Sequence, residues 1–238
     1  MVCRKRICML YGVDMRTITT IDCKNCHPRH HGIFCELSTD ELSYLNQHKV
    51  TKIYPKQVVI FHEGEKPRGL YCLFSGLVKI YKTSSDGKDQ IVRLAQGGDV
   101  LGYRSFFSGE MYAASAQAIE EVTVCYIDQE GINKLIERSP SVLFNLLKKV
   151  CVELREAEEK FQSLMGKSVE ERLAYFMTMF VPKDKKQEVH LPLSREEIAS
   201  LIGARPETVI RALSDWKDQG IIKTRARSFQ FLKPLPFH

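Results

Sequence analysis

Glu207 and Arg211 carry opposite charges and lie four residues apart, the spacing at which two side chains point the same way from a helix. A guanidinium can donate two hydrogen bonds to O6 and N7 of guanine, and a carboxylate can accept one from N4 of cytosine. The same residues could instead be a solvated ion pair on a packing helix, worth about 0.2–0.5 kcal/mol. The choice depends on the element that carries them.

Residues 194–216 predict two short helices joined by a tight turn. Ser194 and Glu197 have the spacing of a capping box, and Gly203 supplies the positive φ that ends a helix. Apolar residues then recur at helical spacing: Ile198, Leu201, Ile202, Val209, Ile210, Leu213 and Trp216. This pattern predicts a DNA-binding helix-turn-helix. Its second helix would place Arg205, Glu207, Thr208 and Arg211 in the major groove.

A two-stranded wing is predicted after Gly220, where the sequence IIKTRARSFQFLK begins. Arg225 and Arg227 would lie at its tip and contact phosphates, which adds affinity without sequence information. Ordinary solvated charge is the alternative interpretation of these arginines. The formal net charge of +6 suits a polyanionic partner without proving one.

A second chemistry belongs to the cysteines. Residues 1–36 hold five of them among several histidines and bases, and do not have the pattern of a folded core. The N-terminus lacks a convincing signal peptide, so we expect a cytoplasmic protein whose cysteines are thiols or metal ligands. Zinc could bind Cys23, Cys26 and Cys35 with one nearby histidine. Cys72 and Cys125 lie in apolar runs, where a cysteine is usually a small hydrophobe. The alternative zinc-binding histidines are His27, His30 and His31.

Between residues 50 and 127 the apolar period changes to two. Strands are expected at 58–61, 70–74, 77–82, 90–95 and 122–127, separated by glycine turns. Short strands at near-regular spacing favour a small antiparallel barrel or jelly roll. Ser38 and Glu41 predict a capped helix in front of it.

From residue 131 the pattern becomes helical again, with a boundary at Ser139-Pro140 and a break at Gly166-Lys167. Ser168 and Glu171 then predict a further capped helix. A strict heptad pattern favours a homodimer seam, although packing on the chain's own barrel is the alternative. The heptad residues are Leu143, Leu147, Val150, Leu154, Ala157, Phe161 and Leu164.

The chain resembles the cyclic-AMP receptor protein/FNR superfamily of bacterial transcription regulators in segments 69–81, 97–103, 122–128 and 204–211. The resemblance implies an α+β protein in four parts. These are a Cys/His-rich segment (1–36), a jelly-roll, cyclic-nucleotide-binding-like sensory β-barrel (37–130), a dimerisation helix (131–165) and a winged helix-turn-helix (166–238). It also implies a homodimer that binds an inverted repeat, with RNA polymerase as a further partner. Glu207 and Arg211 would read the G·C pairs of a TGA half-site core.

The resemblance also bears on the signal. Tyr103 stands where cyclic-AMP binders carry a ribose-binding glutamate, and MYAASAQA (111–118) lacks their phosphate-binding arginine, so cyclic AMP is not expected. The FNR-like branch instead implies a [4Fe–4S] cluster held by Cys23, Cys26, Cys35 and Cys125. The gap of eight residues before Cys35 is longer than in that branch. A small molecule bound in the barrel, with no metal, is the alternative signal.

An enzyme is not expected. A jelly-roll metalloenzyme needs several barrel histidines, and His62 is the only histidine between residues 50 and 189. The sequence also lacks the glycine-rich phosphate loop G-x-x-x-x-G-K-[ST], the H-E-x-x-H zinc motif and the G-x-S-x-G nucleophile motif.

Overall fold

The computed structural model describes residues 21–181, 188–225 and 227–236; Cys3 and Cys8 lie outside these ranges. The chain divides into two compact units. One comprises the residues up to Lys82 and Leu94–Lys149, and the other Thr83–Arg93 and Val150–His238. The long helix α4 (Ser141–Gly166) contributes to both units. The predicted division into a barrel (37–130), a dimerisation helix (131–165) and a winged helix-turn-helix (166–238) therefore stays a prediction.

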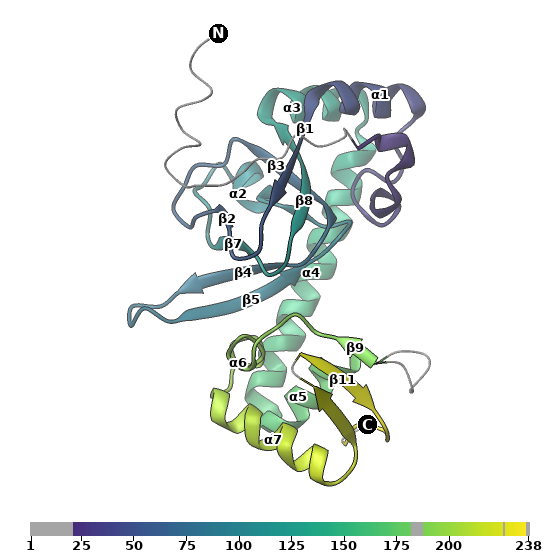
Figure 1. Ribbon diagram of the computed structural model, residues 1–238. Helices are drawn as coiled ribbons and strands as arrows, with labels where there is room; N and C mark the ends of the chain where they lie inside the picture. Colours follow the sequence, from purple (N-terminus) through teal and green to yellow (C-terminus); the bar gives the residue numbers. More distant parts are fainter. Residues whose placement is uncertain (1–20, 182–187, 226, 237–238) are drawn as a thin grey trace. The chain divides into compact units, whose positions relative to one another are not determined.

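Two four-stranded sheets form the β-rich region (Figure 1). One has the order β1-β8-β3-β6 and the other β2-β7-β4-β5. All five predicted strands are present within about two residues of their expected bounds; β1, β6 and β7 are additional. The first sheet contains β1 (Lys49–Tyr54), β8 (Val122–Asp128), β3 (Gly69–Ser75) and β6 (Val100–Leu101); the second contains β2 (Val59–Phe61), β7 (Ser115–Ala118), β4 (Val78–Thr83) and β5 (Asp89–Ala95).

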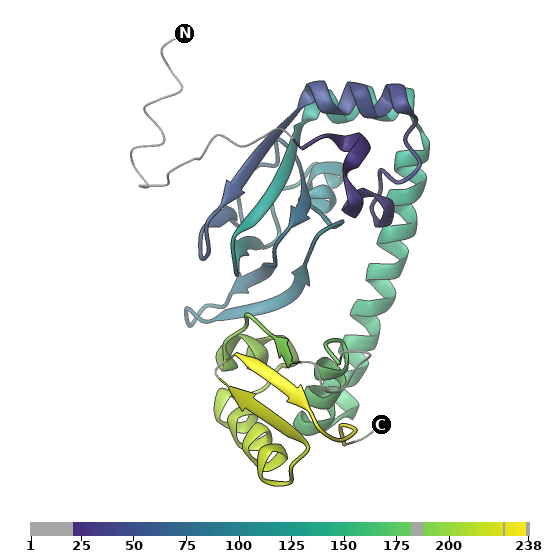
Figure 2. The same ribbon diagram turned by 45° about the vertical axis from the view of Figure 1, so that its right-hand side comes forward.

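The sheet β1-β8-β3-β6 buries both of its faces in two different cores. Alternate residues such as Leu73 and Val124 enter one apolar cluster with residues of the second sheet. Leu70 and Ile127, each three residues away along the same strand, enter the other cluster, because side chains alternate between the two faces of a sheet. Helices and residues 21–36 cover this second face (Figure 2). The helices are α1 (Thr39–His48), α3 (Gln129–Arg138) and the first turns of α4.

The expectation that residues 1–36 contribute no folded core is wrong for the described part, 21–36. Two 3-10 turns, η2 (Cys23–Asn25) and η3 (His27–His31), lead to Ile33 and Phe34, whose side chains are 2% and 6% exposed. Cys23, 6% exposed, packs in the same cluster. The apolar residues of this segment are too few to show a helical or strand pattern. They become buried only because the segment packs against the sheet.

The second unit holds the helix-turn-helix and the wing. Its helices are α5 (Val169–Thr178), α6 (Arg195–Ile202) and α7 (Pro206–Asp218). Strands β10 (Ile222–Arg225), β11 (Ser228–Phe231) and β9 (Glu188–His190) form an antiparallel sheet in the order β10-β11-β9. The hairpin β10–β11 lies beside α7 (Figures 1 and 2).

Local sequence signals set where the helices begin. The capping boxes predicted for α1, α5 and α6 are all present, each with reciprocal hydrogen bonds. A short helix, α2 (Tyr103–Ser108), begins after Gly102, which has a φ of 82°. Among the described residues, no helix has the length and apolar character needed to span a bilayer.

Candidate nucleic-acid interface

The turn between α6 and α7 is fixed by its backbone and by one arginine. Gly203 ends α6 with a φ of 64°, and a Cβ placed on it would lie 2.6 Å from Cδ2 of Leu164. The guanidinium of Arg172 donates hydrogen bonds to the carbonyls of Ile202 (2.8 Å), Gly203 (3.1 Å) and Lys167 (2.6 Å). The bonds to Ile202 and Gly203 satisfy carbonyls that the end of α6 leaves unpaired, and the bond to Lys167 holds the residues before α5. Arg172 was not identified from sequence because its partners are backbone atoms, two of them at least 30 residues away along the chain.

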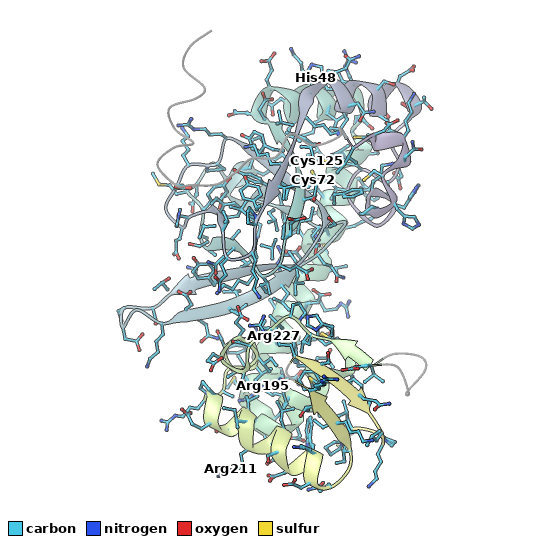
Figure 3. All side chains as sticks on the ribbon, viewed as in Figure 1. His48, Cys72, Cys125, Arg195, Arg211 and Arg227 are labelled. Atoms are coloured by element: carbon cyan, nitrogen blue, oxygen red, sulfur yellow. The ribbon has the colours of Figure 1, made fainter. Side chains whose placement is uncertain are left out.

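Helix α7 has one face in the core and one face free. Val209, Ala212, Leu213 and Trp216 are at most 5% exposed, so they anchor the helix. The opposite surface presents the predicted contacts: Arg205, Glu207 and Arg211 are exposed and Thr208 is half-buried. Figure 3 shows Arg211 at the free surface of α7.

The solvated ion pair, the alternative to DNA contact, is not formed. Within the described residues no salt bridge joins Glu207 to Arg211, so both charges are free for an outside partner. Ile210, which belongs to the apolar pattern of the helix, is 51% exposed and lies outside the core. It lies next to Val209 in sequence, and a rotation of about 100° per residue turns it out of the core.

The two wing arginines differ in their surroundings. Arg225 is exposed at the end of β10, opposite Ser228. Arg227 is half-buried, and its Nη1 donates to the carbonyl of Pro192 at 3.2 Å. Arg225 is therefore the freer of the two for phosphate contact. Lys217 and Lys223, which sequence reasoning did not single out, line one surface depression together with Arg225.

Three of the four cysteines in the predicted cluster set lie near one another. Cys23 and Cys125 are buried, and Cys26 is half-buried. Burial raises the pKa of the Cys23 thiol to about 12, and the charges of Cys125 and Cys26 add to the rise, while Lys49 opposes it. Burial likewise raises the pKa of Cys125, again against Lys49, with a further contribution from Cys26.

Cys35, the fourth cysteine of the predicted set, has a different partner. Its Sγ accepts a hydrogen bond from Nδ2 of Asn145 at 3.6 Å. Cys72 of β3 lies directly opposite Cys125 in the strand register. Burial raises the pKa of the Cys72 thiol, and Cys125, Cys23 and Cys26 add to the rise. Among the described residues, no group of three or more His, Cys, Asp or Glu side chains is arranged to hold a metal ion. The predicted four-thiolate set is therefore not assembled in the described part of the chain.

Tyr103 takes no part in the barrel interior. Its side chain is 2% exposed and packs in the cluster with Leu70 and Val100, on the helix-covered face of the sheet. The opposite cluster, inside the barrel, is filled by aliphatic and aromatic side chains, with Phe61 and Tyr112 stacked at 4.0 Å between ring centroids. The residue in the ribose-binding position is thus a core residue here.

Two family models match the chain. The model described as "Cyclic nucleotide-binding domain" matches residues 51–139, and "Crp-like helix-turn-helix domain" matches residues 171–234. The two matches correspond to the β-rich region with α3, and to the part from α5 through the wing.

Regulators from several bacteria are similar over most of their length. Regulatory protein HlyX of Actinobacillus pleuropneumoniae is 28% identical over 89% of this chain and 90% of its own. Transcriptional activatory protein AadR of Rhodopseudomonas palustris is 30% identical, over 83% and 82%. The solved structure of FixK2 from Bradyrhizobium japonicum matches with a TM-score of 0.70 and 30% identity, over 78% of this chain and 93% of that one. The chain therefore belongs to the CRP/FNR family of DNA-binding transcription regulators, and like these relatives it is not an enzyme.

Proposed function

We propose that this regulator binds, as a homodimer, an inverted repeat with a TGA-like half-site core. The observation that carries the proposal is the outer face of α7, where Glu207 and Arg211 are exposed and unpaired on a helix anchored by four buried residues. Arg211 would donate to guanine and Glu207 would accept from cytosine.

Neighbouring side chains have distinct roles in this proposal. Arg205 and Thr208, near the N-terminus of α7, would contact the backbone or adjacent bases. Ile210, which is exposed on the same helix, offers an apolar surface for a thymine methyl group. Arg225 would bind phosphate, and Arg227 would join it only if its bond to Pro192 opens.

The dimer is supported by the unpartnered face of α4. The heptad residues are exposed in the single chain, Leu147 by 57%, Leu154 by 60% and Phe161 by 66%. Another face of the helix makes polar contacts within the same chain. There Lys149 pairs with Asp99 at 2.7 Å, and Lys160 donates to the carbonyl of Val92 at 2.8 Å. An apolar stripe left free in this way suits a second copy of α4. The full stripe is Leu143, Leu147, Val150, Leu154, Ala157 and Phe161.

Selection of binding sites from random duplex DNA tests the proposal. The full chain is expected to enrich inverted repeats with TGA-like half-sites about one helical turn apart. Enrichment of a single half-site without symmetry would contradict the dimer, and enrichment of an unrelated core would contradict the assignment of Glu207 and Arg211.

For the signal, we propose that redox conditions act on the thiols beneath the N-terminal segment, in the cytoplasm that the sequence predicts. The support is that residues 21–36 are packed on the sheet that carries Cys125. The cluster that the resemblance implies would be one form of this signal.

Iron, zinc and acid-labile sulfide, measured with a visible spectrum on protein purified without oxygen, separate the forms of the signal. About four irons per chain, lost in air, would indicate a [4Fe–4S] cluster. Zinc alone would indicate a structural site and contradict redox sensing through that site. If neither metal is present, thiol titration before and after oxidation shows whether the cysteines themselves are oxidised. DNA affinity that oxidation leaves unchanged would contradict redox sensing and favour a small molecule bound in the barrel as the signal.

A further inference from the structure

We infer that Cys72 and Cys125 are a redox pair that forms a reversible cross-strand disulfide when a hydroperoxide oxidises the protein. Cys72 belongs to β3 and Cys125 to β8, and the two are direct partners in the antiparallel register. Figure 3 shows them side by side. The inference concerns the thiols alone and does not rest on the proposed reading of DNA.

The register gives the pair suitable geometry. Directly opposed residues of an antiparallel pair have Cα atoms about 4.5 or 5.5 Å apart, inside the range of about 4.4–6.8 Å found in disulfides. Their side chains also share one face of the sheet. In the row across this sheet, Cys125 has Thr51 on its other side and Cys72 has Val100. Within this row only Cys72 and Cys125 can form a disulfide with each other.

Two other thiols lie close by and are the competitors. The thiols of Cys23 and Cys26 are near enough to Cys72 to influence its ionisation. The backbone of Cys23, however, is held in place: its N–H donates to Oδ1 of Asn46 (2.8 Å) and its carbonyl accepts from Nε of Arg29 (3.1 Å). A disulfide from Cys23 to Cys125 would join two segments that no strand pairing aligns. Cys72 and Cys125 are already aligned by the strand pairing.

The reaction balances with a peroxide as the oxidant. The sulfur of one thiol attacks a peroxide oxygen as its proton is lost, so that an S–O bond forms, the O–O bond breaks and the leaving oxygen departs as water. The opposite thiol then attacks that sulfur, forming the S–S bond and releasing water. Two electrons from the two thiols reduce hydrogen peroxide to two waters. Cys125 is buried and Cys72 half-buried, so a small oxidant is required.

Peptide mapping tests the inference. The full chain is purified with reductant and chelator, freed of both, treated with hydrogen peroxide, alkylated and digested without reduction. We expect one cross-linked peptide joining Cys72 to Cys125, two hydrogens lighter than its parts, which disappears after treatment with a thiol reductant. A dominant link from Cys125 to Cys23 or Cys26 would overturn the inference. Absence of any link at a peroxide dose that oxidises the exposed Cys151 would overturn it too.

Matched variants keep the result interpretable. Cys72→Ser should abolish the cross-link, while Cys35→Ser, which removes the thiol bonded to Asn145, should leave its yield within about twofold. Cys125→Val is a second variant for the case in which a polar group at position 72 disturbs the sheet. Circular dichroism shows which variants remain folded. A link that persists at Cys125 in Cys72→Ser would show that a different thiol is the preferred partner.

Discussion

At the scale of single residues, function depends on which side chains the packing leaves free. Glu207 and Arg211 are available because Val209 and Leu213 hold the opposite face of α7 in the core. The same packing leaves Ile210 exposed, although it belongs to the apolar pattern of the helix. Residue type suggested the chemistry, and burial assigned each residue to the core or to the outer face.

Arg211→Ala should weaken binding by about 1–3 kcal/mol at one G·C position of the half-site and relax the preference there, because a bidentate contact is lost. Fluorescence anisotropy with operators that differ at single positions measures this. Lys217→Ala is the matched control, since Lys217 lies at the other end of α7 and should not change the preference. If Arg211→Ala weakened all sequences equally, Arg211 would contact only phosphate.

Arg172→Ala should lower the free energy of unfolding by about 1–3 kcal/mol, because the carbonyls of Ile202 and Gly203 at the turn, and that of Lys167 before α5, lose a charged donor. Urea denaturation of the full chain measures the change. Arg155→Ala, which breaks only the exposed i,i+4 pair with Glu159, should cost about 0.5 kcal/mol or less. Equal losses in the two variants would refute a special role for Arg172.

At the scale of elements, α4 shows why a periodic pattern needs a structure to interpret it. The heptad pattern alone fits either a dimer seam or packing on the chain's own barrel. In the structure, Val142 and Leu146 are buried in the chain's own core, whereas Leu147 and Leu154 of the heptad stripe are exposed. Two different faces of one helix therefore serve two purposes.

Leu147→Asp should dissociate the homodimer, because a buried charge at the seam has no partner in the second copy. Analytical ultracentrifugation measures the mass. The side chain is 57% exposed in the single chain, so the monomer is expected to stay folded. Gln162→Asp, also exposed on α4 but outside the stripe, is the control and should leave the mass unchanged. An intact dimer in Leu147→Asp would remove the seam from α4.

At the scale of the whole molecule, symmetry links the two proposed functions of dimerisation and DNA reading. A two-fold dimer presents two α7 helices, so its site must be an inverted repeat with fixed spacing. The binding energy then depends on both half-sites being on one face of the duplex.

Inserting about five base pairs between the selected half-sites should reduce affinity to that of a single half-site, because the insertion rotates one of them by half a helical turn. Anisotropy titrations at fixed salt measure this loss, since salt alone shifts protein–DNA affinity. An insertion placed outside the repeat is the control. Unchanged affinity would mean that the two subunits bind independently.

The sequence by itself determined the features that depend on neighbouring residues. The three capping boxes, Gly203 at the turn and the strand periods all follow from local backbone chemistry, and the structure confirms them. The order of elements and the motif at 204–211 were sufficient to predict the family, which the comparisons confirm.

Only the tertiary structure decided which distant residues meet. The docking of Cys23 and Phe34 on the sheet, the bonds of Arg172 to the turn and the pairing of Cys72 with Cys125 join segments far apart in sequence. No period or spacing encodes these contacts, because they depend on strand register and on which faces the packing buries. The set of Cys23, Cys26, Cys35 and Cys125 came from the family resemblance, whereas strand register places Cys72 directly opposite Cys125.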